Sequence, residues 1–139
     1  MAKKVVLIVD DEAETRSAFR EFLEQAGYAP VEAADGLEAL AQAERRLPHA
    51  ILLDIRMPEL DGFEVCRRLK ANPVTKAIPV IVVTAVQTDA LNRLAYEVGA
   101  LACIVKPVRL EALLAIIRTA IASTERRAQR KAKREGNLP

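Results

Sequence analysis

Five polar residues that can do chemistry each follow a short apolar segment of the chain. Asp10 and Asp11 follow the first such segment, Asp54 the third, Thr84 the fourth and Lys106 the fifth. If these segments are parallel strands of an open sheet, their carboxyl ends meet at the edge where such sheets bind ligands. Chain order alone then predicts that three carboxylates, a hydroxyl and an ammonium share one pocket.

A pocket of this composition suits phosphoryl transfer. Carboxylates about 4 Å apart repel one another by about 4 kcal/mol per pair at an effective dielectric constant of about 20. A hard divalent cation relieves this repulsion, and Mg²⁺ prefers one or two carboxylates together with water and phosphate oxygens. Asp54 can then act as a nucleophile toward a phosphoryl group. Lys106 would supply a positive charge for the phosphoryl oxygens, and Thr84 a hydroxyl donor.

The segments that must position these residues read as strands. The five strand candidates span residues 5–9, 30–33, 50–53, 80–83 and 102–105. Four of them are unbroken apolar runs, which is typical of strands buried on both faces of a parallel sheet. The second contains proline and glutamate, so we expect it at an edge of the sheet.

Apolar residues between the strand candidates recur at the spacing of one helix face. Leu91, Leu94, Ala95 and Val98 fall at i, i+3, i+4 and i+7, and two other segments repeat this spacing. Strands that alternate with helices form right-handed crossover units. We therefore predict an α/β fold, a doubly wound sheet of five parallel strands.

Composition and charge restrict the class of protein. The chain has 139 residues, 51% of them hydrophobic, which indicates one globular domain with a core. Its apolar runs are too short to span a bilayer, so we expect a cytoplasmic protein without a membrane span. Cys66 and Cys103 lack the spacing of metal ligands and are expected to be reduced core residues.

The C-terminal segment has a charge of its own. Residues 125–135 contain six Lys or Arg and two Glu, whereas the whole chain has a net charge of only +2. We therefore divide the chain into a domain at 1–124 and a basic tail or helix extension at 125–139. The extension is either a solvated helix end or a docking segment for an acidic partner or an anionic surface. No aromatic residue interrupts its charges, so base stacking and direct DNA binding are not predicted.

Taken together, these residues resemble the signature of bacterial response-regulator receiver domains, including the chemotaxis regulators. The resemblance runs in order over about residues 4–123 and rests on four motifs: Asp10-Asp11, residues 53–58 with Asp61-Gly62 after them, Thr84-Ala85, and Lys106-Pro107. It implies a flavodoxin-like sheet of order 2-1-3-4-5 with five helices. It also implies a switch, not an enzyme, which accepts a phosphoryl group on Asp54 from a sensor histidine kinase or a phosphotransfer protein.

The resemblance implies a role for each residue of the site. Asp11 and Asp54 would bind Mg²⁺ directly, Asp10 would bind it through water, and the backbone carbonyl of Arg56 would complete the protein ligands. Lys106 would contact the phosphoryl group. Its neighbour Pro107 would fix the loop in a cis peptide.

The switch of the family is expected to differ here. The resemblance implies that Thr84 follows the phosphoryl group and draws the Thr84-Ala85 loop inward. Members of the family usually have Tyr or Phe three residues before the lysine, and this chain has Cys103. An aromatic rotamer therefore cannot accompany the movement of Thr84. The kinase is expected to contact the first helix, and an unknown output partner the face formed by the fourth helix, fifth strand and fifth helix.

Three other functions remain open at this point. One is a receiver-like scaffold that phosphorylation does not control, an option that Cys103 keeps open. Another is an aspartyl-phosphate phosphatase. Such enzymes have the pattern Asp, any residue, Asp after the first strand, whereas residues 10–12 of this chain read Asp-Asp-Glu. The third is a flavin or nucleotide carrier, although the chain contains no G-x-G-x-x-G motif and no P-loop.

Overall fold

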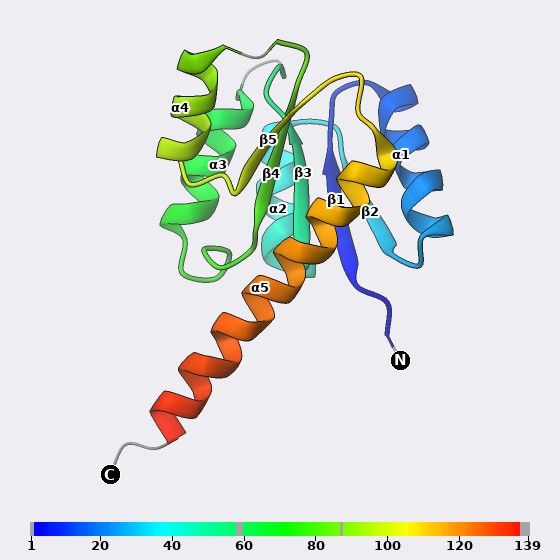
Figure 1. The fold of residues 1–139 in the computed structure, drawn as a ribbon. Helices are drawn as coiled ribbons and strands as arrows, with labels where there is room; N and C mark the ends of the chain where they lie inside the picture. Colours follow the sequence, from blue (N-terminus) through cyan, green and yellow to red (C-terminus); the bar gives the residue numbers. More distant parts are fainter. Residues whose placement is uncertain (1, 58–59, 87, 137–139) are drawn as a thin grey trace.

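The computed structural model describes residues 2–57, 60–86 and 88–136, and its strands form one parallel sheet of order β2-β1-β3-β4-β5 (Figure 1). The predicted fold class and strand order are confirmed. The strands are β1 (Val5–Val9), β2 (Ala29–Ala33), β3 (Ala50–Asp54), β4 (Val80–Thr84) and β5 (Ala102–Val105). The helices in the described part of the chain are α1 (Ala13–Gln25), α2 (Gly36–Arg46), α3 (Gly62–Ala71), α4 (Asp89–Glu97) and α5 (Leu110–Gly136).

The strand register aligns the carboxyl ends of the central strands. Asp54 and Thr84 are the last residues of β3 and β4, one residue inside the strands that the sequence predicted to end before them. Asp54 pairs with Val83, and Thr84 pairs with Val105, directly before Lys106. Asp54, Thr84 and Lys106 therefore lie together at the end of the sheet where β3, β4 and β5 terminate.

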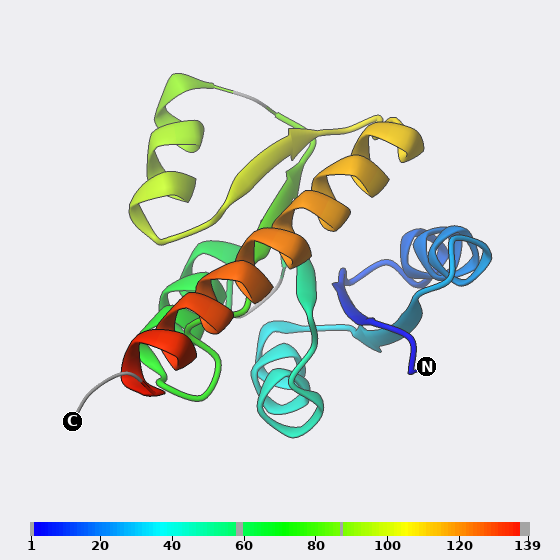
Figure 2. The same ribbon diagram turned by 60° about the horizontal axis from the view of Figure 1, so that its bottom comes forward.

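Two apolar layers hold the sheet in place. One contains the buried residues of α2, α3 and α4 against alternate residues of the strands, such as Leu53 and Val82. The other contains the buried faces of α1 and α5 against the intervening residues, such as Leu52 and Ile81. In Figure 1, α5 crosses in front of the strands and α2 lies behind them, and Figure 2 shows the two sides edge-on. Because β3 is buried on both faces, Asp54 lies at the end of a strand that the core encloses.

Local signals explain where several helices begin and end. The side chains of Asp35, Asp61 and Thr88 accept hydrogen bonds from the backbone N–H three residues later, so each caps a helix. Gly99, with φ of 94°, takes the left-handed conformation after α4 that glycine adopts at little cost. The Asp61 cap matters most for function, because it fixes the start of α3 beside Asp54.

The last helix extends well beyond the last residue that it buries. Its buried residues are Leu113, Ile117, Ala120 and Ile121, in its first half, whereas Arg126 and the helical residues after it are exposed. Figure 1 shows this second half projecting beyond the sheet. Within the described residues, no helix combines the length and the apolar character needed to cross a membrane.

Candidate functional site

Three carboxylates converge where β1 and β3 end. Asp10 directly follows β1, and its side chain is almost completely buried, as is that of Asp54 at the end of β3 (residue exposures of 3% and 7%). Asp11 is exposed beside them. Each residue offers a carboxylate oxygen within 4.8 Å of the other two. The predicted acidic cluster is therefore assembled by the fold.

Lys106 reaches this cluster from the end of β5. Its Nζ lies 3.6 Å from Oδ2 of Asp10 and 4.0 Å from Oδ2 of Asp54. The backbone N–H of Lys106 donates to the carbonyl oxygen of Thr84 at 2.7 Å, which ties the ends of β4 and β5 together. The peptide bond between Lys106 and Pro107 is cis, as the family resemblance implied.

Backbone donors orient the two buried carboxylates. The N–H of Glu12 donates to Oδ1 of Asp10 at 2.9 Å, and the N–H of Arg56 donates to Oδ1 of Asp54 at 3.3 Å. The guanidinium of Arg16 donates to the carbonyl oxygen of Asp10 at 2.7 Å. The two backbone N–H contacts engage the Oδ1 atom of each carboxylate, whereas the Oδ2 atoms face the Lys106 ammonium.

The electrostatics of the site leave an excess of negative charge. Burial raises the pKa of Asp54, and the neighbouring charges of Asp10 and, more weakly, Asp11 raise it further. The Lys106 ammonium and the Arg56 N–H oppose this change in pKa without overcoming it. Three carboxylates around one ammonium are a set of hard oxygen donors with surplus charge, so these residues fit a divalent cation such as Mg²⁺.

Thr84 lies at the site, but its hydroxyl is occupied by its own loop. The residue is 3% exposed. Its Oγ1 donates to the carbonyl oxygen of Val86 at 3.0 Å and accepts from the Val86 N–H at 3.2 Å. The neighbouring Ala85 is exposed. The hydroxyl is therefore at the predicted strand end, with its hydrogen bonds directed along the loop.

Cys103 occupies the β5 position at which the family usually has an aromatic ring. It pairs with Val82 in the sheet and packs, half-buried, against the layer of α2, α3 and α4. Burial raises the pKa of its thiol, as it does for Cys66. Both described cysteines are free.

The sequence did not reveal one contributor to the site, Gly62 at the start of α3. Its N–H donates to the carbonyl oxygen of Ile55 at 3.0 Å, and its Cα packs against the backbone of Asp54. The motif contained this glycine, but only the close approach of two backbone segments reveals its purpose. Pro58, also in the motif, lies outside the described residues. The backbone carbonyl of Arg56 stays a predicted metal ligand.

Comparisons with known proteins point in one direction. A family model described as "Response regulator receiver domain" matches residues 6–118. The probable transcriptional regulator ycf27 of Porphyridium aerugineum is 37% identical over 140 residues, which cover 100% of this chain and 55% of that protein. The response regulator MprA of Mycobacterium leprae is 38% identical over 120 residues, 86% of this chain and 52% of that protein. The chain thus spans about half the length of these relatives.

Solved structures give the same picture. Chemotaxis protein CheY4 of Vibrio cholerae superposes with a TM-score of 0.81 at 33% identity, over 86% of this chain and 99% of that one. The receiver domain of sensor histidine kinase PA1611 from Pseudomonas aeruginosa has a TM-score of 0.80 at 29% identity, over 87% and 99% of the two chains. The latter structure is described as having a magnesium ion coordinated in the active site cleft.

Proposed function

The chain belongs to the response regulator receiver family, and from this premise we propose that its phosphoryl acceptor is Asp54. Receiver domains are signalling switches that accept a phosphoryl group on an aspartate from histidine kinases or phosphotransfer proteins. The observation that carries the assignment is the position of Lys106 Nζ, within 4.0 Å of buried carboxylate oxygens of both Asp10 and Asp54. Burial and the charge of Asp10 raise the pKa of Asp54.

The transfer step follows from this arrangement. A carboxylate oxygen of Asp54 forms a bond to phosphorus while the P–N bond of a phosphohistidine donor breaks. The electron pair of that bond leaves with the imidazole, which takes a proton from solvent. Lys106 stands where its ammonium neutralises charge on the transferred phosphoryl oxygens. The N–H of Arg56 holds the other Asp54 oxygen in place during the attack.

Mg²⁺ is the cofactor that we propose for this step. Receiver domains bind Mg²⁺ at an acidic cluster, and the oxygens of Asp10, Asp11 and Asp54 lie within 4.8 Å of one another. We assign Asp11 and Asp54 as direct ligands, Asp10 as a ligand through water, and the Arg56 carbonyl as a further ligand. When bound, the ion neutralises charge on carboxylate and phosphoryl oxygens.

Phosphorylation would then change the loop after β4. To donate a hydrogen bond to the phosphoryl group, the Thr84 hydroxyl must give up its bond to the Val86 carbonyl, so the Thr84-Ala85 loop changes conformation. The added phosphoryl group brings about −1.5 to −2 units of charge. Because Cys103 has no ring to rotate, we assign the response to the Thr84 loop and to the packing of α4.

The partner surfaces follow from the same proposal. The kinase or phosphotransfer protein docks near α1, whose start adjoins the acidic cluster, and the output partner binds the face of α4, β5 and α5. We also propose the domain division at residues 124 and 125, with the projecting part of α5 as a separate functional segment. Receiver domains typically work in the cytoplasm, and we propose that compartment for this chain.

Labelling with a small phosphodonor tests the function. The protein is incubated with radiolabelled acetyl phosphate and Mg²⁺, and bound phosphate is counted. Asp54→Ala should abolish labelling, whereas Asp10→Ala should weaken it, because Asp10 contributes charge and a water-mediated contact. Equal labelling of the Asp54→Ala variant would place the acceptor elsewhere.

A further inference from the structure

A groove lies at the opposite end of the sheet from the acidic cluster. It is formed by the segment before β4, the turn between α4 and β5, and the middle of α5, and has a volume of about 610 Å³. Four of its lining residues are cations, namely Lys70, Lys76, Arg127 and Lys131. None of the described residues that line it is acidic.

Apolar side chains complete this groove. Tyr96 at the end of α4 is 82% exposed, and Leu101 before β5 is 51% exposed. Both line the groove together with Pro79 and Ala120. Large apolar side chains that adjoin one another on a surface are typical of a binding site. The groove therefore offers apolar contacts and positive charge side by side.

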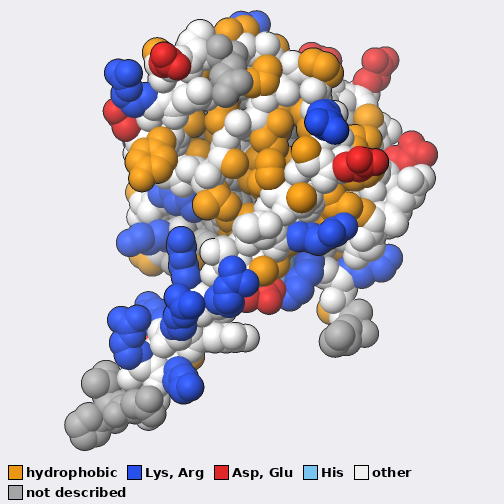
Figure 3. Space-filling view, in the orientation of Figure 1, with side chains coloured by type: hydrophobic (Ala, Val, Ile, Leu, Met, Phe, Trp, Pro, Cys, Tyr) orange, Lys and Arg blue, Asp and Glu red, His pale blue; other side chains and the backbone are white. Residues whose placement is uncertain are grey.

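The projecting half of α5 extends the positive charge away from the domain. It carries six cations, which we call the basic face: Arg126, Arg127, Arg130, Lys131, Lys133 and Arg134. At about 100° per residue they fall within an arc of roughly 160°, with Ala128 and Ala132 on the opposite side. Figure 3 shows Lys and Arg side chains gathered along this helix and at the adjoining edge of the domain.

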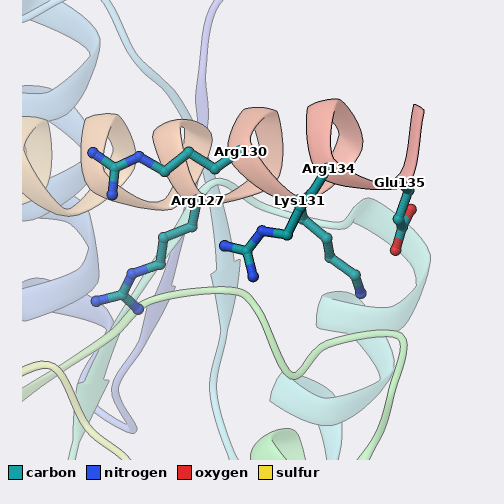
Figure 4. Close-up of a pocket in the computed structure, with 5 residues that line it drawn as sticks. All are labelled: Arg127, Arg130, Lys131, Arg134 and Glu135. Atoms are coloured by element: carbon teal, nitrogen blue, oxygen red, sulfur yellow. The ribbon is translucent and has the colours of Figure 1, made fainter. Parts of the chain in front are cut away.

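The basic face and the groove are continuous. A second hollow, shown in Figure 4, is lined by Arg127, Arg130, Lys131, Arg134 and Glu135, so Arg127 and Lys131 belong to both hollows. In Figure 4 the side chains of Arg127, Lys131 and Arg134 leave the helix on the same side. A ligand that enters the groove would therefore meet further cations along the helix.

Apart from Glu135, no acidic residue among those described lines either hollow. The ion pairs between described residues involve none of the basic-face or groove cations. Like charges at i and i+4 in a helix, as at Arg127 and Lys131, destabilise it. An anionic ligand would remove this repulsion. Among the cations that line the groove, the Lys70 ammonium is fixed by the protein itself, because its Nζ donates hydrogen bonds to the carbonyl oxygens of Lys76 and Ile78.

We propose that the groove and the basic face bind an acidic peptide segment of a partner protein, one that also carries apolar side chains. Carboxylates would face Lys76, Arg127 and Lys131, and apolar side chains would pack on Tyr96 and Leu101. A nucleic acid backbone would contact the cations but would leave the apolar side chains of Tyr96 and Leu101 without a partner. A membrane surface would need bulky apolar residues opposite the basic face, where Ala128 and Ala132 stand.

This inference deepens the proposed partner-binding role of the face of α4, β5 and α5, on which it rests, by stating the chemistry of the partner. It does not involve the acidic cluster, which lies at the other end of the strands. The two claims can therefore fail separately: phosphate labelling tests Asp54, and peptide binding tests the groove.

Fluorescence anisotropy with the full chain tests the proposal. The probe is a labelled synthetic peptide of alternating Glu and Leu, about twelve residues long. Two comparison probes are a Glu-Gly peptide of equal charge and a labelled DNA duplex. We expect the Glu-Leu peptide to bind more tightly than either comparison probe. The triple variant Lys76→Gln, Arg127→Gln, Lys131→Gln should weaken its binding about tenfold, from three partly exposed ionic contacts.

Matched variants make the result specific. The variant Lys3→Gln, Arg45→Gln, Arg118→Gln removes the same charge from exposed positions outside both hollows and should bind as the unaltered chain does. Tyr96→Ala, at an 82% exposed position, should weaken binding several-fold without lowering the Tm. Equal loss in both triple variants, or tighter binding of the DNA duplex or the Glu-Gly peptide, would overturn the proposal. Unchanged phosphate labelling of the groove variant would confirm that its acidic site is intact.

Discussion

Gly62 packs against Asp54 so closely that a Cβ on the glycine would lie 2.5 Å from the Asp54 carbonyl oxygen. The same Cβ would lie 2.8 Å from the Cα of Ile55. Both neighbours are backbone atoms, which cannot move aside as the end of a flexible side chain can. The start of α3 is thus pressed against the residue proposed to accept the phosphoryl group.

Gly62→Ala should therefore disturb both stability and the site. Forcing a methyl group into this contact costs about 1 to 3 kcal/mol, as overpacking does elsewhere. We expect a lower Tm by differential scanning fluorimetry and slower labelling by acetyl phosphate. Gly136→Ala is the matched control, because a Cβ there meets nothing within 4 Å. Equal Tm values for the two variants would contradict the packing argument.

The ionised carboxylate of Asp54 should destabilise the metal-free protein. Burial and then Asp10 raise its pKa, so the folded state holds the proton more tightly than the unfolded state. The stability that this group contributes is complete below its unfolded pKa and is lost as pH rises through the raised folded pKa. In EDTA at neutral pH, Asp54→Asn should therefore raise the free energy of unfolding by about 1 kcal/mol, or Tm by roughly 3 °C.

The pH dependence separates this effect from a change in packing. The amide oxygen of Asn can still accept the Arg56 N–H, so the geometry is kept. Below the unfolded pKa of aspartate, at about pH 3, the gain in Tm should disappear, because the protonated carboxyl of Asp54 and the amide of the Asp54→Asn variant are both neutral. Thermal melts at both pH values check this prediction, with the exposed Asp89→Asn as the control. A gain of equal size at both pH values would count against it.

Removal of Lys106 should have the opposite effect in EDTA. Its ammonium is the cation that faces the Oδ2 atoms of both Asp10 and Asp54. Lys106→Met should lower the free energy of unfolding. The loss should be only about 1 kcal/mol, because the Lys106 side chain is partly exposed and solvent screens its attraction to Asp10 and Asp54. The double variant with Asp10→Asn should recover part of this loss, because it removes one of the two carboxylates left without their cation. Additive losses in a double-mutant cycle would show that the charges do not interact.

The projecting part of α5 should be dispensable for the fold. Among described residues, the ion pair of Glu125 with Lys4 is the last one along the chain, and the buried residues of α5 end at Ile121. Ending the chain after Glu125 should leave Tm within about 1 °C and leave phosphate labelling unchanged. Urea unfolding followed by circular dichroism gives a second measure of stability. A loss of several degrees would mean that residues 126–139 stabilise the domain.

Much of the fold and the site could be predicted because the relevant signals are local. The unbroken apolar runs of β1, β3 and β4 are what burial on both faces of a sheet requires. The equally apolar run of β5 suggested the same burial, but this strand lies at an edge of the sheet and its residues are only half-buried. Once the strands are parallel, their carboxyl ends must share one edge, so chain order places Asp10, Asp54 and Lys106 together. Strand ends were missed by one residue at Asp54 and Thr84, because a polar residue that ends a strand looks like the start of a loop.

The remaining features depend on contacts between distant segments. Gly62 has no side chain to signal its approach to Asp54. His49 accepts the Val5 N–H at its Nδ1 and so joins the start of β1 to the segment before β3. Charge counts identified the basic segment, but not its continuity with Lys76 and Tyr96, which lie far from it along the chain. These contacts arise only when the layers pack.

The most direct test is to identify the residue that carries the phosphoryl group. After labelling with acetyl phosphate and Mg²⁺, borohydride reduction converts an aspartyl phosphate to homoserine, which peptide mass spectrometry locates. The proposed function predicts homoserine at Asp54 alone, and none when Mg²⁺ is replaced by EDTA. Homoserine at Asp10 or Asp11, or none in the complete reaction, would contradict it.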